Sequence, residues 1–126
     1  THDVRATEER ICAVEAIGNA SADASAAMLR FSQRVERTIV GWHSAPLHDP
    51  CTVAYVLAPD IFTLKPARID IETQSDLTRG HTAVEMRVEG VTAPHLWAAQ
   101  VDAQRVYDLI GANLTKANGA NTGAAQ

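Results

Sequence analysis

A histidine and an aspartate stand side by side at positions 48 and 49, between prolines at 46 and 50. An imidazole can give up a proton near neutral pH because its unperturbed pKa is about 6.5, and a carboxylate can bind a cation. Residues 50–58 are almost entirely apolar, which predicts that the pair lies at the start of a helix. His48 and Asp49 are therefore the first candidates for chemistry.

The same residues also have a purely structural interpretation. Asp49 is a preferred N-cap residue, and Pro50 suits the first helical position because an N–H there would have no partner. Capping accounts for Asp49 and Pro50 but gives His48 no role. Since open α/β sheets bind ligands at the rim where helices begin, a binding site at this helix start is the competing interpretation.

The composition predicts one globular domain. The 126 residues are 46% hydrophobic and 21% charged, which is ordinary for a chain with a modest core. A net charge of −4 without a basic cluster argues against a nucleic-acid partner. No apolar run approaches the about 20 residues of a membrane span, so no membrane partner is expected. The first residue is Thr rather than Met, which suits a cut or processed segment.

The two cysteines, Cys12 and Cys51, fit neither a disulfide framework nor a zinc pattern. Each falls in a predicted helix, and free cysteine is among the most buried residue types. We expect two buried thiols and a reducing, cytoplasmic compartment.

Hydrophobic periodicity places the elements along the chain. It predicts helices over 8–17, 23–39 and 50–58, the last of them buried nearly all round, and another helix after an Asp102 cap. It predicts an antiparallel hairpin from strands 67–72 and 82–88, then a strand over 93–101. The tail 115–126 is expected to be disordered. The inner face of the second helix is expected to consist of Ala24, Met28, Phe31, Val35 and Ile39.

Further motifs accompany the His-Asp pair in a fixed order. Residues 46–54 read PLHDPCTVA, 59–63 read PDIFT, 71–73 read IET and 77–82 read LTRGHT. This series resembles the inosine-uridine type nucleoside hydrolases, where a P-L-H-D-P segment opens a helix, a P-x-L-F-T turn ends it, and a V-E-T…T-R-G-x-T hairpin follows. The resemblance runs from residue 1 to about 114 and covers only the C-terminal part of that family, whose members are more than twice as long. It implies an α/β fold, here the C-terminal part of an open Rossmann-like sheet with an antiparallel hairpin and flanking helices.

The resemblance also implies an activity, which is hydrolysis of the N-glycosidic bond of ribonucleosides to ribose and free base by calcium-bound water. In that family Asp49 would be a Ca²⁺ ligand that also touches the ribose, and His48 would be the general acid or hydrogen-bond donor toward the leaving base. Trp42 either packs or lines the cleft on the approach to His48. Val40 stands where pyrimidine-preferring relatives often carry a tyrosine, and Glu85 where the family often has Asp.

The family's N-terminal D-x-D…D-D cluster, which supplies most of the calcium carboxylates, has no match here. One aspartate cannot hold Ca²⁺, which takes about six to eight oxygen ligands. We therefore expect the chain alone to be inactive. Its expected partners are the ribonucleoside substrate and the N-terminal half of the enzyme, which is absent from this chain or present as another one. Homo-oligomers are usual in the family. The alternative is a non-catalytic structural fragment or interaction module derived from it.

The remaining candidates carry less chemistry. His2, His43, His81 and His95 lack a metal-ligand spacing and are expected as surface or loop histidines. Residues 78–80 either approach the cleft or only turn the hairpin, and the turn is favoured because it needs no more than the glycine. Strand edges left unpaired by the missing half predict poor solubility or self-association.

Overall fold

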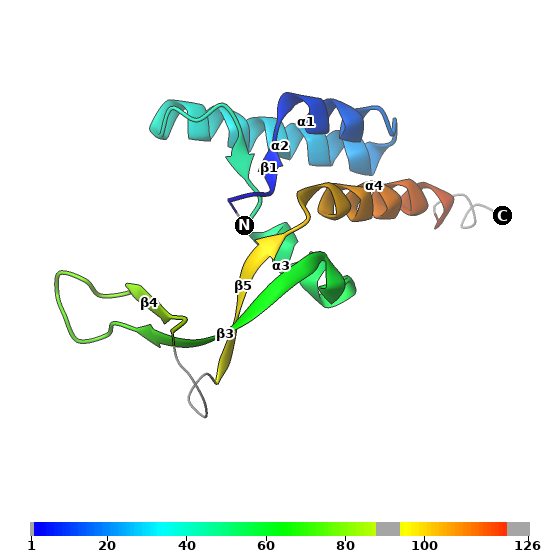
Figure 1. The fold of residues 1–126 in the computed structure, drawn as a ribbon. Helices are drawn as coiled ribbons and strands as arrows, with labels where there is room; N and C mark the ends of the chain where they lie inside the picture. The colour runs from blue at the N-terminus through cyan, green and yellow to red at the C-terminus, as the bar shows by residue number, and fades with distance from the viewer. Residues whose placement is uncertain (1, 88–93, 121–126) are drawn as a thin grey trace. The chain divides into compact units, whose positions relative to one another are not determined.

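The computed structural model describes residues 2–87 and 94–120 (Figure 1). The chain divides into two compact units, one formed by the residues up to Ile61 and those from Val101 onward, and the other by Phe62–Gln100. The segment from Phe62 to Gln100 contributes strands, with Ala67 as its buried apolar residue among those described, and forms a sheet of its own. The expectation of one globular domain stays a prediction.

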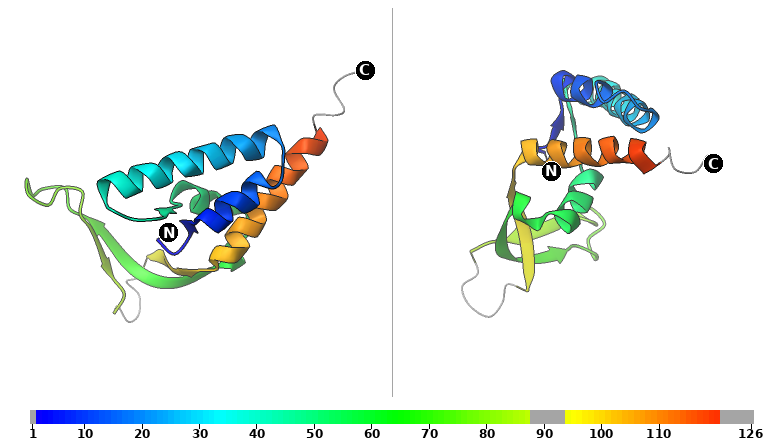
Figure 2. Two further views of the ribbon diagram at one scale, coloured as in Figure 1. Left: turned by 90° about the horizontal axis from the view of Figure 1, so that it is seen from above. Right: turned by 90° about the vertical axis from the view of Figure 1, so that its right-hand side faces the viewer.

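The first unit opens with two helices that lie side by side (Figure 2). Helix α1 spans Glu8–Glu15, and the side chain of its N-cap Thr7 accepts a hydrogen bond from the amide of Arg10. Helix α2 spans Ala20–Ile39 and is capped by Asn19, so it begins three positions before the predicted start. Gly18, with φ of 69°, makes the turn between them, a conformation that glycine adopts without steric cost.

Two short strands and two further helices complete this unit. Strands β1 (Arg5–Ala6) and β2 (Ala45–Pro46) pair antiparallel. Helix α3 spans Asp49–Leu57, and the 3₁₀ helix η1 spans Pro59–Ile61. Helix α4 spans Ala103–Ala120 and is capped by Asp102, whose Oδ1 accepts from the amides of Gln104 and Arg105. The predicted disorder is thus wrong for residues 115–120, where the helix continues, while 121–126 lie outside the described residues.

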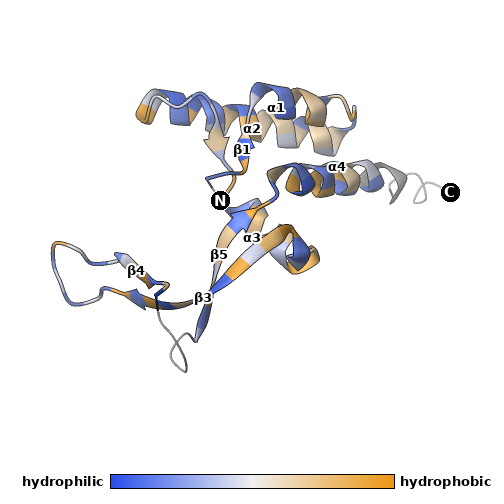
Figure 3. Cartoon of the chain, viewed as in Figure 1, coloured by the Kyte–Doolittle hydropathy of each residue, from blue (hydrophilic) through white to orange (hydrophobic). Residues whose placement is uncertain are grey.

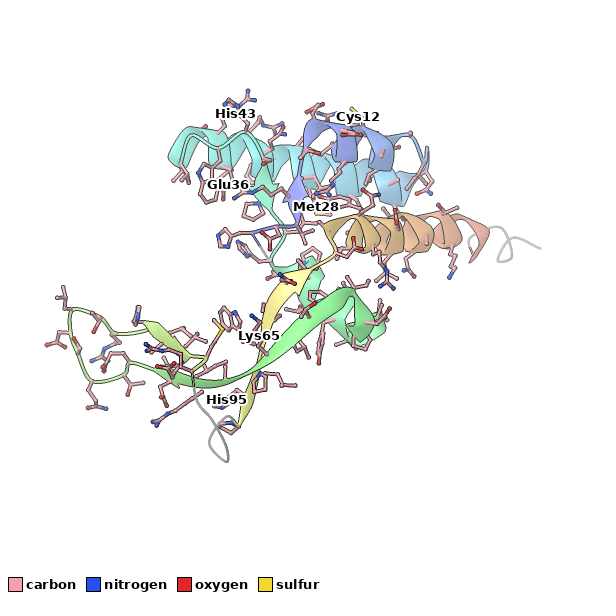
Figure 4. The ribbon with its side chains drawn as sticks, in the orientation of Figure 1. Cys12, Met28, Glu36, His43, Lys65 and His95 are labelled. Carbon is pink, nitrogen blue, oxygen red and sulfur yellow. The ribbon has the colours of Figure 1, made fainter. Side chains whose placement is uncertain are left out.

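The core of the first unit is small and aliphatic. Its largest fully buried side chains are Ile11, Val4 and Val106, and the other buried apolar residues are Ala6, Val14, Ala22, Ala26, Ala45, Leu47, Cys51, Ala54, Ile61 and Tyr107. Cys51 is buried as expected, but Cys12 is exposed and projects outward from α1 (Figure 4).

The faces of α2 and α3 differ from the prediction. On α2 the predicted inner residues Met28, Phe31 and Ile39 are exposed, and Ala22 and Ala26 are buried instead. Helix α3 buries Cys51 and Ala54 but exposes Val53, Val56 and Leu57, so it is not buried all round. Figure 3 shows the hydropathy of its residues in orange where they are apolar. Periodicity identifies an apolar stripe, but it cannot say whether the chain itself supplies the surface that covers it.

The second unit is a three-stranded sheet in the order β4-β3-β5. Strand β3 spans Phe62–Ile71, β4 spans Thr82–Glu85 and β5 spans His95–Val101. The predicted antiparallel hairpin is confirmed, with Arg68 opposite Glu85 and Ile71 opposite Thr82. Predicted strand positions 88 and 93 lie outside the described residues. No helix in the described part of the chain is long and apolar enough to cross a membrane.

The loop of this hairpin is held by local hydrogen bonds. The Glu72 carboxylate accepts from the amides of Gln74 and Ser75, and these bonds lower the pKa of that carboxyl. Gly80 takes φ of 86°, and its amide donates to the carbonyl of Glu72. Residues 78–80 therefore form part of the turn that the sequence predicts for this hairpin.

Candidate functional site

The His-Asp pair lies at the start of α3, one residue out of the predicted register. His48, not Asp49, occupies the N-cap position, and its side chain makes no capping hydrogen bond. Asp49 is the first helical residue, so Pro50 follows within the first turn, where its missing N–H breaks no helical bond. The prediction of Asp49 as N-cap is thus wrong, and capping explains neither side chain.

Both side chains of the pair are exposed. Among the described residues no hydrogen bond or ion pair engages the Asp49 carboxylate, while its backbone carbonyl accepts from the Thr52 hydroxyl at 2.7 Å. A carboxylate at the first helical position is favoured by the partial positive charge of the helix N-terminus. Its oxygens face solvent and are available to a ligand.

The two-stranded pairing fixes what lies beside His48. The amide of Leu47 donates to the carbonyl of Val4 at 2.8 Å, next to the paired residues Arg5 and Pro46. The Arg5 guanidinium donates to the carbonyl of Ser44 at 3.1 Å. Hydrogen bonds therefore hold the segment before α1 beside the segment that leads into α3.

Three rings meet at this junction. The His2 ring lies edge to face against the His48 ring, with centroids 5.3 Å apart and planes at 75°. It meets the Trp42 ring in the same manner, at 6.1 Å and 84°. The Arg5 guanidinium lies 4.5 Å from the centroid of the Trp42 ring, a cation–π distance. The result is an exposed aromatic cluster of His2, Trp42 and His48.

Trp42 joins this cluster and keeps 37% of its surface exposed. Its contacts with His2 and Arg5 are packing contacts, and its remaining surface is exposed. Ligand contact, the other alternative for this residue, stays a prediction.

His2 is the site residue that sequence reasoning missed. It was expected as an ordinary surface histidine because no local motif connects it to His48. The pairing of β1 with β2 makes that connection, and such pairing between distant short strands leaves little periodic signal. Of the other histidines, His43 projects outward from its loop (Figure 4), and His95 accepts a hydrogen bond from the amide of Ile69.

A calcium site is not complete within the described residues. These residues include no group of three or more histidine, cysteine, aspartate or glutamate side chains that could hold a metal ion. Asp49 offers one carboxylate, whereas Ca²⁺ takes about six to eight oxygens. The described residues by themselves do not fit a bound calcium ion.

Two cavities of the first unit lie elsewhere. One, of about 430 Å³, is apolar and lined by α3 and α4 residues that include Val53, Leu57 and Ile110. The other, of about 380 Å³, lies between α1 and α4 and is lined by Arg10 and Tyr107, among others. Neither is lined by His48 or Asp49.

Comparison with known proteins gives consistent matches. Residues 1–108 match the family described as inosine-uridine preferring nucleoside hydrolase. The chain is 40% identical, over 112 residues, to the pyrimidine-specific ribonucleoside hydrolase RihA of Shewanella baltica, and the match covers 87% of this chain and 35% of that protein. The chain thus spans about a third of the length of such curated relatives.

Solved structures show the same fold. A plant nucleoside hydrolase superposes with a TM-score of 0.75 at 20% identity, over 90% of this chain and 38% of that one. A purine-preferring ribonucleoside hydrolase from Gardnerella vaginalis superposes with a TM-score of 0.73, also at 20% identity, over 90% of this chain and 36% of that one. The expected α/β class is confirmed by these neighbours.

Proposed function

Because this chain belongs to the inosine-uridine preferring nucleoside hydrolase family, we propose that it forms the part of a ribonucleoside hydrolase that carries His48 and Asp49. The reaction is hydrolysis of the N-glycosidic bond to ribose and free base. The observation that supports this proposal is that two exposed side chains at the start of α3, an imidazole and a carboxylate, are both left out of helix capping.

His48 serves the leaving base in this proposal. Cleavage of an N-glycosidic bond develops negative charge on the base nitrogen, and a donor that protonates or hydrogen-bonds the base lowers that barrier. Imidazole suits the task near neutral pH. The aromatic cluster around His48 offers a planar base a surface of matching chemistry.

Asp49 serves the sugar. Successive helical residues project about 100° apart, so His48 and Asp49 can address the base and the ribose at the same time. The free Asp49 carboxylate can accept from ribose hydroxyls and supply one oxygen ligand to Ca²⁺, with the other ligands contributed from outside the described residues. A bound calcium ion would hold the sugar hydroxyls and the attacking water in place.

The partner in this proposal is the rest of the enzyme. This chain spans 35% of the RihA relative, and its α2 and α3 expose apolar stripes that contain Phe31, Ile39, Val53 and Val56. A protein surface that covers those stripes would bury area now open to water. The complete enzyme is proposed to be a homo-oligomer that works in cytoplasmic nucleoside salvage.

A second candidate is a non-catalytic structural or interaction module derived from the same family. The absence of a metal-binding group among the described residues favours it. In that case the His-Asp pair would be a remnant of ancestry without turnover.

Reassembly separates the two candidates. The chain is mixed with a separately produced segment of the Shewanella baltica RihA that precedes the matched region, and base release from uridine, cytidine and inosine is followed with added calcium. Release by the mixture, and by neither part alone, is the expected result. A pair that is folded by circular dichroism and associated by gel filtration, yet releases no base, would favour the module.

A further inference from the structure

The contact between His2 and His48 points to a role that neither the family match nor the His-Asp motif assigns. We propose that His2 is a positioning residue for the nucleobase, which holds the rings of His48 and Trp42 as the wall against which the base stacks. This proposal rests on the proposed function and specifies how the same site recognises its substrate.

The first argument is that His2 lies between the two rings. Its centroid is 5.3 Å from that of His48 and 6.1 Å from that of Trp42, with interplanar angles of 75° and 84°. Edge-to-face pairs place the positive edge of one ring against the negative face of the other, which makes them attractive and orientation-dependent. One ring that makes two such contacts restricts the tilt of both neighbours.

The second argument is that the backbone on each side of the contact is fixed. Val4 and Leu47 are buried and joined by the 2.8 Å amide-to-carbonyl bond, and they lie close along the chain to His2 and His48 respectively. Arg5 secures the Trp42 ring from another direction, at 4.5 Å from its centroid, and also donates to Ser44. The backbone that carries the three rings is therefore held in place by these contacts, although the rings themselves are exposed.

The third argument concerns what such a surface can bind. His2, Trp42 and His48 are all exposed, so a planar ligand can reach them. Heteroaromatic bases stack on aromatic side chains regardless of their hydrogen-bonding pattern, because every base has a π-face. Stacking on a surface that is already oriented costs less entropy than stacking on mobile rings. His2 thus improves binding of the base without taking part in proton transfer.

The test uses the reassembled enzyme and separates KM from kcat. In His2→Ala the KM for uridine and inosine is expected to rise roughly two- to tenfold while kcat stays within about a factor of two, because the variant loses the edge-to-face ring contacts that orient the stacking wall. His2→Phe keeps the ring edge and is expected to restore KM to near the parent value. His43→Ala, a histidine of the same loop as Trp42 that projects outward, is the matched control and should change neither constant.

A second readout does not depend on turnover. With Trp97 replaced by phenylalanine, Trp42 becomes the one tryptophan of the chain, and its fluorescence and the ring-proton contacts between positions 2, 42 and 48 report the cluster directly. His2→Ala should shift the Trp42 emission, and His43→Ala should not.

The outcomes are distinguishable. A parent that releases base, with the KM of His2→Ala unchanged, or with His2→Phe as poor as His2→Ala, overturns the positioning role and leaves the proposed function standing. A fall in kcat at constant KM also overturns it, since that result would mean that His2 acts on proton donation by His48 and not on stacking of the base. Absence of base release from the folded, assembled parent overturns the proposed function and this inference together.

Discussion

The carbonyl of Val4 accepts a hydrogen bond from the amide of Leu47 at 2.8 Å, and both residues are buried. This bond joins the segment that precedes α1 to the segment that precedes α3. It explains why an exposed site can still be ordered, because the rings of His2 and His48 are attached to backbone segments that this hydrogen bond holds together. The same bond brings together the two segments that carry His2 and His48, although these residues lie far apart in the sequence.

Replacement of His48 by alanine should cost the reassembled enzyme about 10²- to 10⁴-fold in kcat, the usual contribution of a positioned acid. The measurement is base release at saturating uridine. His43→Ala is the matched control and should retain the parent rate. Turnover unaffected by His48→Ala would show that the imidazole is only part of the fold.

Removal of calcium with a chelator should abolish base release, and added Ca²⁺ should restore it. Asp49→Asn should raise the calcium concentration needed for half-maximal activity by at least about tenfold, because an amide is a weaker ligand than a carboxylate for a hard cation. Asp23→Asn, an exposed aspartate in the first turn of α2, is the control. Equal calcium dependence in both variants would contradict a metal role for Asp49.

Arg30 connects α1 to α2 through two carboxylates, at 2.6 Å from Glu8 and 2.7 Å from Glu15. These hydrogen bonds lower the pKa of both glutamates from the usual 4.5. Because the folded-state pKa values are depressed, the stabilisation is complete above pH 4.5 and is lost as the pH falls through them. Urea midpoints of Arg30→Met and its parent should therefore differ at pH 7 and converge as the pH falls below 4.5 and through the lowered pKa values of the two glutamates. Arg37→Met should show no such convergence, and equal midpoints at pH 7 would contradict the role of Arg30.

The hydroxyl of Tyr107 is buried and has no hydrogen-bond partner within the part of the chain that the structure describes. Burial raises the pKa of Tyr107 to about 12. Since an unsatisfied buried hydroxyl carries a desolvation cost, Tyr107→Phe should stabilise the first unit by about 1 kcal/mol in urea denaturation. Tyr107→Ala, which also removes the ring, should destabilise it by about 3–5 kcal/mol. Destabilisation by the phenylalanine variant would indicate a partner for the hydroxyl.

The exposed stripe of α3 should make the isolated chain self-associate. Val56 is 79% exposed and lies beside Val53 and Leu57, so Val56→Lys should lower the apparent mass in light scattering at high protein concentration. Leu77→Lys changes a side chain that is 93% exposed in the hairpin loop, and it should have little effect. A monodisperse monomer of the unmodified chain would contradict this prediction.

Local signals in the sequence identified much of the fold. The N-cap Asp102 was predicted correctly because a cap depends on residues within one helical turn. The β3–β4 hairpin was predicted because alternation and a turn glycine are likewise local. The start of α3 was misplaced by one residue, since Asp49 and Pro50 satisfy helix-start preferences in either register.

The missed features depend on partners distant in sequence. Met28 and Phe31 follow a helical apolar period, yet they are exposed, because a pattern does not reveal whether this chain supplies the covering surface. The pairing of Arg5 with Pro46 brings His2 close to His48, and no local sequence signal predicts this pairing. His48 and Asp49 were found because one contiguous motif carries them.

The contrast between the two thiols has a practical use. The Cys51 side chain is buried, donates to the carbonyl of Leu47 at 2.9 Å, and has its pKa raised by that burial, whereas Cys12 is exposed on the outer side of α1. A maleimide dye should therefore couple to Cys12 and spare Cys51, since the thiolate is the reactive form. Such labelling would give the native sequence a fluorescent handle for following assembly with the rest of an enzyme, with no engineered attachment point.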